Sequence, residues 1–314
     1  MDALAAERFE ASRDRLASLA YRLLGSAADA EDVVQDAFLR WQAADRDRIE
    51  VPEAWLTKIV TNLCLDRLRS AQARRERAVG AWLPEPLLEG DPMLGPADVV
   101  EQRESVSLAV LTLMERLSPV ERAVYVLREA FSYRHTEIAD ILGIAESASQ
   151  QHLHRARRRV AAGRRGDVVD VVDSADARRI VEAFLDAATS GQTERLIALL
   201  AEDATAVSDG AGVADRLLLF PTPERFAASI RGVLRPSEGK RRRAGGSVEL
   251  HAAVVNGSPA MIAVVGDRVA GLMVLEMREG KIASAYGMAS PKRLGRLTEM
   301  WAKREHGAPI TRLW

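Results

Sequence analysis

The hydrophobic positions between Phe131 and Arg159 recur every three or four residues, which predicts two short helices. Gly143 is predicted to end the first of them, because glycine adopts the left-handed backbone conformation without a steric penalty. The second is predicted to begin near Glu146. Two helices joined by so tight a turn have the spacing of a helix-turn-helix.

The second of these helices has one apolar side and one side rich in hydrogen-bonding groups. A helix fits the major groove of DNA, where such side chains reach base edges and phosphates. We interpret the polar side as a candidate DNA-binding surface; the alternative is a helical hairpin with a solvated face. The candidate contacts are Ser147, Ala148, Gln150, Gln151, His154, Arg155 and Arg158.

Helical periodicity also covers residues 7–76, where it predicts three further helices. The middle helix, Asp29–Trp41, has an apolar stripe for the core and a polar outer face. Solvation alone accounts for a face of this polarity, so the residues by themselves do not assign it a partner. Its exposed candidates are Asp29, Asp32, Gln35, Asp36 and Arg40.

The third helix is predicted from about Pro52 to Glu76 and is cationic on its outer side. With a polar loop before it and tryptophans nearby, it suits a melted nucleic-acid strand, because arginines neutralise phosphates and extruded bases find shaped pockets. A solvated basic face explains the same pattern, and this helix alone does not separate the two. The candidate contacts are Lys58, Asn62, Arg69, Arg74 and Arg75.

Two stretches without helical periodicity divide the chain. Residues 77–104 are acidic and contain the run Trp82-Leu83-Pro84-Glu85-Pro86, whose prolines exclude a helix. They are predicted to be a spacer, or a segment that lies in a basic channel of a partner. The predicted organisation is a helical domain at 1–76, a linker at 77–104, a helix-turn-helix domain at 105–163, a second linker at 164–175 and a further domain at 176–314.

Within the second helical domain, Ser118-Pro119-Val120-Glu121 predicts a capping box at a helix start. Beyond residue 176 the pattern changes from helices at 176–189, 193–200 and 225–234 to strands at 248–256, 260–265, 269–278 and 281–288. Asn256-Gly257 and Glu279-Gly280 are turn pairs between strands. Helices followed by a meandering antiparallel sheet predict an α+β domain that can enclose a pocket, with the basic run 240–243 as a solvated loop.

Composition narrows the function classes. The formal net charge of −1 argues against a protein that coats nucleic acid non-specifically, and a single cysteine, Cys64, excludes an internal disulfide. The five histidines show no metal-ligand spacing, so neither a metal nor a cofactor is expected. The charged N-terminus does not resemble a signal peptide, and no apolar run is long enough to span a bilayer, so we expect a cytoplasmic protein without a membrane partner.

Several motifs, in their order and spacing, resemble an extracytoplasmic-function (ECF) sigma factor of bacterial RNA polymerase. They are AYRLLGSAADAEDVVQDAFLRW (20–41), WLTKIVTNLCLDRLRS (55–70), LSPVERAVYVLREAFSYRHTEIADILGI (117–144) and HLHRARRRV (152–160). WLPEPL (82–87) and the C-terminal half resemble the SigJ-type subgroup, which carries a fused SnoaL-like domain of the cone-shaped nuclear-transport-factor superfamily. The resemblance implies a multidomain fold: two all-α sigma domains, the second a helix-turn-helix, followed by an α+β cone-shaped SnoaL-like domain.

The resemblance also implies partners. The helix Asp29–Trp41 would bind the clamp coiled coil of core RNA polymerase, and the helix Trp55–Arg75 would melt and read the −10 promoter element as a single strand. Residues Ser147 to Arg158 would bind the −35 element as duplex DNA, and the acidic linker would thread the polymerase interior. The protein would not be an enzyme, because the polymerase forms the bonds.

The subgroup's further motifs are altered in this chain. Its Asp-Gly-Gly-Gly-Lys motif appears as Asp209-Gly210-Ala211-Gly212-Val213, and its Asn-Pro-Asp-Lys-Leu motif appears as Ser290-Pro291-Lys292-Arg293-Leu294. The resemblance implies that the C-terminal domain modulates the sigma domains as an intramolecular partner. The candidate regulatory residues are Trp82, Pro84, Asp209, Gly210 and Gly212.

Two alternatives remain open from the residues. The C-terminal domain could be a sensor that holds a small ligand in its pocket, or an isomerase- or cyclase-like enzyme, which needs a buried carboxylate beside a hydrogen-bond donor. Its polar candidates, Asp209, His251, Asp267 and Tyr286, are joined by no motif. A helix-turn-helix regulator that acts without polymerase is the second alternative, and it leaves residues 20–76 unexplained.

Overall fold

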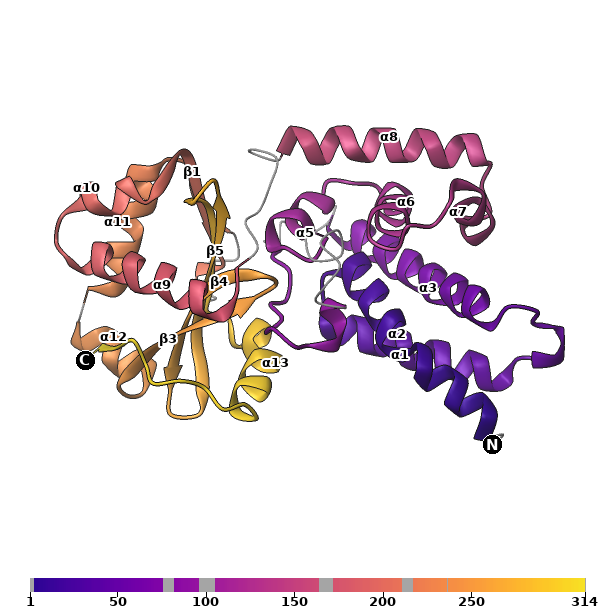
Figure 1. Ribbon diagram of the computed structural model, residues 1–314, viewed down its shortest axis with the longest axis horizontal. Helices are drawn as coiled ribbons and strands as arrows, with labels where there is room; N and C mark the ends of the chain where they lie inside the picture. The colour runs from indigo at the N-terminus through magenta and orange to yellow at the C-terminus, as the bar shows by residue number, and fades with distance from the viewer. Residues whose placement is uncertain are drawn as a thin grey trace. The chain divides into compact units, whose positions relative to one another are not determined.

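The computed structural model describes residues 3–75, 82–95, 105–163, 172–210, 217–235 and 237–313. The chain divides into two compact units. The N-terminal unit comprises residues 1–79 and 90–164, and the C-terminal unit comprises residues 80–89 and 165–314. The first is helical and the second combines helices with a sheet (Figure 1). Among the described residues, no helix is both long and apolar enough to cross a membrane.

The first part of the N-terminal unit contains the three predicted helices. They are α1 (Ala3–Leu24), α2 (Ala27–Ala43) and α3 (Pro52–Arg75), with a short 3-10 turn η1 (Arg46–Arg48) in the polar loop. The side chain of Ser26 accepts a hydrogen bond from the backbone of Asp29 and caps α2. The predicted start of α3 at Pro52 is confirmed, and its end lies within one residue of the prediction.

Aromatic side chains join these helices. The ring centroids of Phe9 on α1 and Phe38 on α2 are 4.9 Å apart, and those of Trp41 and Trp55 are 5.7 Å apart. Tilted ring pairs at such distances stabilise the fold by more than the burial of their apolar area alone. Cys64 on α3 is fully buried, and this burial raises the pKa of the thiol, as is typical of a structural cysteine.

The second part of the N-terminal unit confirms the predicted helix-turn-helix. It contains α5 (Leu108–Met114), α6 (Pro119–Glu129), α7 (His135–Leu142) and α8 (Glu146–Gly163). Both hydrogen bonds of the predicted capping box between Ser118 and Glu121 are present at the start of α6. Gly143 ends α7 with φ = 66°, the left-handed conformation that its sequence position predicted.

Two arginines of the N-terminal unit, Arg22 and Arg122, are unexpectedly buried. Arg22 is fully buried and donates to the backbone oxygens of Met93 (3.2 Å) and Leu94 (2.9 Å), which form part of the 3-10 turn η2 (Pro92–Leu94). Burial lowers the pKa of Arg22 to about 10, so the guanidinium stays charged at neutral pH. These charge-assisted bonds hold residues 91–95, part of the predicted linker, against α1.

The C-terminal unit is built on a mixed sheet whose strands are ordered β2-β1-β6-β5-β4-β3-β7. The predicted hairpins β3 (Val248–Val255), β4 (Ser258–Val265), β5 (Arg268–Arg278) and β6 (Lys281–Met288) are confirmed as an antiparallel meander. The strand β1 (Leu200–Ser208) pairs in parallel with β6, and the short strands β2 (Leu218–Phe220) and β7 (Thr311–Leu313) complete the edges.

Helices cover both faces of this sheet. The helices α9 (Ser174–Thr189), α10 (Thr193–Ala198) and α11 (Pro223–Leu234) bury their apolar sides against one face, where Phe184 and Phe226 join the core (Figure 1). The helix α13 (Pro291–Ala302) packs against β5 through its buried side. Alternate residues of β3 separate the faces: Leu250 joins the main core, and its neighbour His251 contacts Trp301 of α13.

Several elements differ from the prediction. The strand β1 was predicted as a helix end followed by unassigned chain, because its acidic residues interrupt the alternation that identifies strands. The basic run 240–243 was predicted as a loop but lies in α12 (Glu238–Ala244), which Ser237 caps at its start and Gly245 ends at φ = 83°. Arginine and lysine favour helices once both caps are in place.

The predicted linker 77–104 also differs from a free spacer. Residues 82–89 belong to the C-terminal unit, and the described residues 90–95 belong to the N-terminal unit. Leu83, Leu87 and Leu88 are buried, and Leu88 forms a β-bridge with Val255. The apolar side chains between the acidic ones explain the difference, because burial removes them from water. We refer to residues 82–89 as the docked segment.

Candidate nucleic-acid interface

The candidate −35 contacts share one outward side of α8. Leu153, Ala156 and Val160 bury the opposite side of the helix. Ala148 is half-buried and the other candidates are exposed, as a surface that enters a groove requires. The exposed candidates are Ser147, Gln150, Gln151, His154, Arg155 and Arg158.

A polar contact sets the packing of α8 on α7. Ser149 is fully buried on α8, and its hydroxyl lies 2.9 Å from Nδ1 of His135 at the start of α7. A buried hydroxyl without a partner costs free energy, so this bond stabilises the packing of the two helices. The sequence does not identify this partner, because His135 lies 14 residues away on another helix.

Arg155 is engaged within the fold. Its Nε donates to Glu121 Oε1 at 3.1 Å, and Arg159 donates to the other oxygen of the same carboxylate. Burial by itself raises the pKa of Glu121, but hydrogen bonds from Ser118 and Arg155 and the charge of Arg159 outweigh it and lower the pKa. Arg155 therefore fixes α8 to α6, a structural role that its sequence position did not reveal.

The candidate −10 residues lie along α3. Lys58 is exposed and Asn62 is half-buried. Arg69 is exposed and pairs with Asp66 at 3.4 Å, one turn away. Arg74 and Arg75 belong to the last turn of α3, and their side chains lie outside the described residues. The structure thus describes the side chains of three of the five candidates, and all three lie on α3.

The polar face of α2 is organised around Arg67 of α3. Its guanidinium lies 3.2 Å from Asp29, 3.4 Å from Asp32 and 3.5 Å from Asp36. The helical spacing of these aspartates brings them to one side, where a single cation partly balances them. Gln35 and Arg40 are exposed nearby on the same helix, and Leu39 is exposed by 55%. Spacing alone predicted the shared face but not the central arginine.

The regulatory candidates converge within the C-terminal unit. The buried carboxylate of Asp209 accepts hydrogen bonds from the backbone of Ala289 (2.9 Å) and Ser290 (3.1 Å), at the start of α13. Arg293 of α13 lies 3.9 Å from the same carboxylate and donates to the backbone oxygen of Leu83. Three motifs far apart in the sequence therefore meet at one place.

The remaining regulatory candidates surround this junction. Pro84 is buried and Trp82 is half-buried in the docked segment. The backbone of Gly210 donates to the Ser208 hydroxyl at 3.1 Å, which orders the end of β1. Gly212 lies outside the described residues. The sequence did not predict the contact between Arg293 and Leu83, because these residues lie 210 positions apart.

Comparisons with known proteins agree with this arrangement of helices. Residues 8–74 match the family model of Sigma-70 region 2, and residues 107–160 match that of Sigma-70 region 4. The ECF RNA polymerase sigma factor SigJ of Mycobacterium tuberculosis is 35% identical over 294 residues, which are 90% of this chain and 91% of the relative. The chain belongs to the ECF sigma factor family.

Further similarities extend over both units of this sigma factor. The probable ECF sigma factor SigI of Mycobacterium tuberculosis is 32% identical over 91% of this chain and 93% of its own length. The crystal structure of SigJ from the same organism superposes with a TM-score of 0.68 at 29% identity, covering 92% of this chain and 98% of that one. The fold is therefore two helical sigma domains followed by a SnoaL-like domain, as the sequence predicted.

The family membership assigns the elements to regions. In this sigma factor α2 and α3 lie in region 2, and α6, α7 and α8 lie in region 4. Sigma factors bind core RNA polymerase and promoter DNA, and as a class they are not enzymes. The family membership therefore favours a transcription initiation factor over the alternative of a helix-turn-helix regulator that acts without polymerase.

Three of the four polar residues considered for catalysis make separate structural contacts, and the fourth, Tyr286, is buried on β6. Asp209 holds the start of α13, and Asp267 is exposed in a turn between strands. His251 is buried against Trp301, with ring centroids 5.2 Å apart, and its burial lowers the pKa of the imidazole. The arrangement of these residues is that of separate structural contacts.

Proposed function

We propose that this initiation factor contacts core RNA polymerase through the acidic face of α2 and promoter DNA through α3 and α8. The exposed side of α8 supports the duplex −35 assignment, because its hydrogen-bonding side chains share one face and α7 packs behind it. The cationic side of α3, with Lys58 and Arg69 exposed, suits the melted −10 strand. Since the partner polymerase is a cytoplasmic enzyme, the protein would act there.

The C-terminal unit is proposed to modulate this activity through the docked segment. Residues 82–89 belong to that unit, whereas the described chain on either side of them, up to residue 75 and from residue 90, belongs to the N-terminal unit. Any change in how tightly the docked segment is held therefore acts on the connection between region 2 and region 4. This connectivity is the single observation on which the proposed modulation rests.

Run-off transcription with core polymerase tests both the proposed initiation activity and its proposed modulation by the C-terminal unit. A template is first obtained by selecting active promoters from a randomised library with the full chain. We expect the full chain to direct specific starts, and variants that release the docked segment to change the amount of transcript without abolishing polymerase binding. Failure to bind core polymerase would contradict the assignment of α2, and unchanged transcription from released variants would contradict the modulation.

We propose no catalytic role for the C-terminal unit. A carboxylate or imidazole that acts as a general acid or base must lie within reach of a bound substrate. The described residues that line the cavity between the sheet and α11 carry neither group. A binding role is the alternative that the cavity supports.

A further inference from the structure

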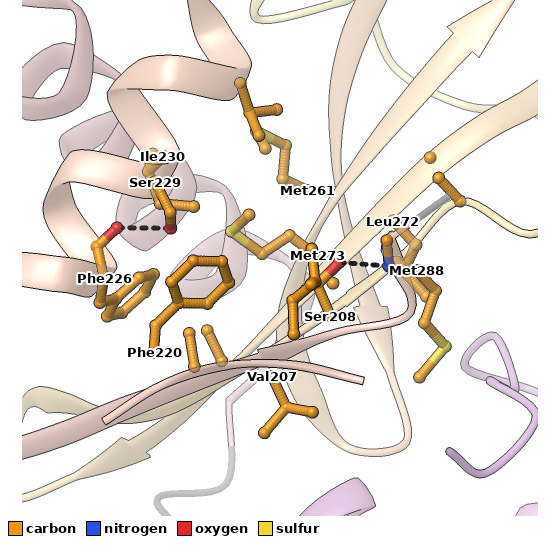
Figure 2. Close-up of a pocket in the computed structure, with 18 of the residues that line it drawn as sticks. Val207, Ser208, Phe220, Phe226, Ser229, Ile230, Met261, Leu272, Met273 and Met288 are labelled. Carbon is orange, nitrogen blue, oxygen red and sulfur yellow. Dashed lines mark hydrogen bonds between the residues drawn. The ribbon is translucent and has the colours of Figure 1, made fainter. Parts of the chain in front are cut away.

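The C-terminal unit contains a partly open cavity of about 470 Å³ between the sheet and α11. Figure 2 shows its walls: Phe226 and Ile230 come from the helix, and Met261 and Met273 come from the facing strands. A volume of this size is in the range of small-molecule sites. The exposed side chains of Leu218 (37%) and Val233 (59%) also line the cavity, so its rim is apolar as well.

Small residues of the sheet create this space. Ala263 of β4 lies opposite Gly271 of β5, and Ala206 of β1 lies opposite Ala285 of β6, and all four line the cavity. Larger side chains at these positions would fill the volume. An apolar ligand that fills this space removes apolar surface from water, which favours binding.

Most polar side chains that line the cavity already form hydrogen bonds with the protein backbone. The hydroxyl of Ser229 donates to the backbone oxygen of Phe226 at 2.7 Å. The ammonium of Lys240 donates to backbone oxygens at the end of α11, including those of Val233 (3.0 Å) and Arg235 (2.8 Å). The Ser208 hydroxyl accepts from Gly210, so it can still donate its hydrogen to a ligand.

The lining chemistry therefore selects one class of ligand. A cation would lose its hydration without gaining an opposite charge, because the described lining has no acidic residue. An anion would meet only Lys240, whose N–H groups already donate to the backbone oxygens of Gly232, Val233 and Arg235. The three methionines, Met261, Met273 and Met288, adapt to apolar shapes and contact aromatic rings favourably. The fitting ligand is uncharged and predominantly apolar, with one hydrogen-bond acceptor for Ser208.

The wall of the cavity continues into the junction that holds the docked segment. Ser208 and Gly210 line the cavity on either side of Asp209, and Met288 and Ala289 line it just before Ser290. Asp209 binds the backbone of Ala289 and Ser290, and Arg293 links this carboxylate to Leu83. A ligand that orders the ends of β1 and β6 thus acts on the residues that hold the docked segment.

We propose that this cavity binds an uncharged, predominantly apolar small molecule, and that its occupancy strengthens the attachment of the docked segment through Asp209 and Arg293. The binding stands independently of the proposed modulation, whereas the coupling rests on it.

Dye binding to the full chain tests the first part. N-phenyl-1-naphthylamine is an uncharged apolar fluorophore, and 8-anilinonaphthalene-1-sulfonate is a similar molecule with a negative charge. We expect saturable binding of one neutral dye per chain, at least tenfold tighter than the anionic dye. Absence of saturable binding, or equal affinity for the two dyes, would overturn the assignment of the ligand class.

Variants locate the dye. Ser229→Phe on α11 and Ala263→Leu on β4 add volume to the cavity from two sides, and each is expected to weaken neutral-dye binding at least tenfold. Ala228→Phe adds the same ring at the adjacent, exposed position of α11, outside this cavity, and should bind like the natural chain. Circular dichroism and thermal unfolding establish that each variant is folded. Unchanged binding in both folded filling variants would place the dye elsewhere.

Hydrogen exchange tests the coupling. The amides of Leu87 and Glu89 are bonded to Asn256 and Val254, so their exchange reports how firmly the docked segment is held. Saturating neutral dye should slow their exchange at least twofold in the natural chain and have little effect in Arg293→Ala. Bound dye with unchanged exchange would overturn the coupling alone. This outcome is distinguishable from failure of the transcriptional modulation, which is measured without dye.

Discussion

Leu87 and Asn256 exchange two hydrogen bonds although they lie 169 residues apart. The N–H of Leu87 donates to Asn256 Oδ1 at 2.8 Å, and the N–H of Asn256 donates to the oxygen of Leu87 at 2.9 Å. Asn256 has φ = 52° and begins the turn between β3 and β4. The same residue thus supplies a left-handed turn position and the partner of the docked segment.

Asn256→Gly should release the docked segment. Glycine adopts the left-handed conformation of the turn, so the hairpin is kept, while the buried N–H of Leu87 loses its acceptor at a cost of about 1–3 kcal/mol. We expect faster hydrogen exchange at residues 87–89 and a changed yield in run-off transcription.

Glu279→Gly is the matched control for this change. Glu279 is also left-handed, at φ = 52°, in the turn between β5 and β6, and it is exposed. It should leave exchange in the docked segment unaltered. Equal exchange in Asn256→Gly and Glu279→Gly would contradict the role of the Asn256 side chain.

Removal of the Arg155 side chain should lower the stability of the fold, whereas removal of the Arg158 side chain should weaken DNA binding. Arg155→Ala leaves the buried Glu121 with one arginine partner fewer, so we expect a stability loss of about 1 kcal/mol in urea unfolding. Arg158→Ala removes an outward cation, so we expect weaker binding of selected −35 duplexes with unchanged unfolding.

Salt dependence then separates the contact types for Arg158. A phosphate contact weakens binding to all sequences and lowers the salt slope by about 1, whereas a guanine contact costs roughly 1–3 kcal/mol at one position. Arg157→Ala is the control, because Arg157 pairs with Glu129 at 2.8 Å. Equal DNA binding by Arg158→Ala and the natural chain would contradict the assignment of this residue to the interface.

Asp36→Ala should weaken binding to core polymerase several-fold if the acidic face of α2 is the contact surface. Asp29 and Asp32 share that face with Asp36 around Arg67. Asp66→Ala on α3 removes the same charge from an exposed position that pairs with Arg69 and serves as the control. Competition for core polymerase against the natural chain gives the affinities. Indistinguishable affinities for the two variants would argue that general charge, rather than the α2 face, drives association.

The stability of the C-terminal unit should fall as the pH drops below about 6.5, the ordinary pKa of histidine. Burial lowers the pKa of His251, and the nearby His306 lowers it further, while Glu249 partly opposes the shift. The unfolded chain therefore binds a proton at a pH where the folded chain does not, which favours unfolding.

His251→Phe keeps an aromatic ring against Trp301 and removes this titration. Urea midpoints at pH 5 and pH 7.5 should differ less for the variant than for the natural chain. A pH dependence identical in both proteins would assign the effect to other groups.

The helix-turn-helix could be predicted from the sequence because its signals are local. The left-handed Gly143, the capping box at Ser118 and the spacing of the buried side of α8 each involve residues within one or two helical turns. For the same reason, the turn pairs at Asn256 and Glu279 predicted the end of β3, the end of β5 and the start of β6 to within one residue.

Contacts between distant segments determined the rest. The burial of Arg22 against residues 93 and 94, the pairing of Arg155 with Glu121, and the parallel pairing of β1 with β6 depend on segments that meet only after folding. Periodicity reports which side of an element is buried, but it does not report which partner covers that side.

The sequence by itself determined the family, the helical character of the N-terminal unit and the exposed face of α8, since these follow from local propensity and motif order. Tertiary structure alone decided that an acidic, proline-containing stretch lies buried against the C-terminal unit, and that small residues on neighbouring strands leave a cavity. Both outcomes arise from long-range packing, in which the burial of Leu83 and Leu87 outweighs the polar character of their neighbours.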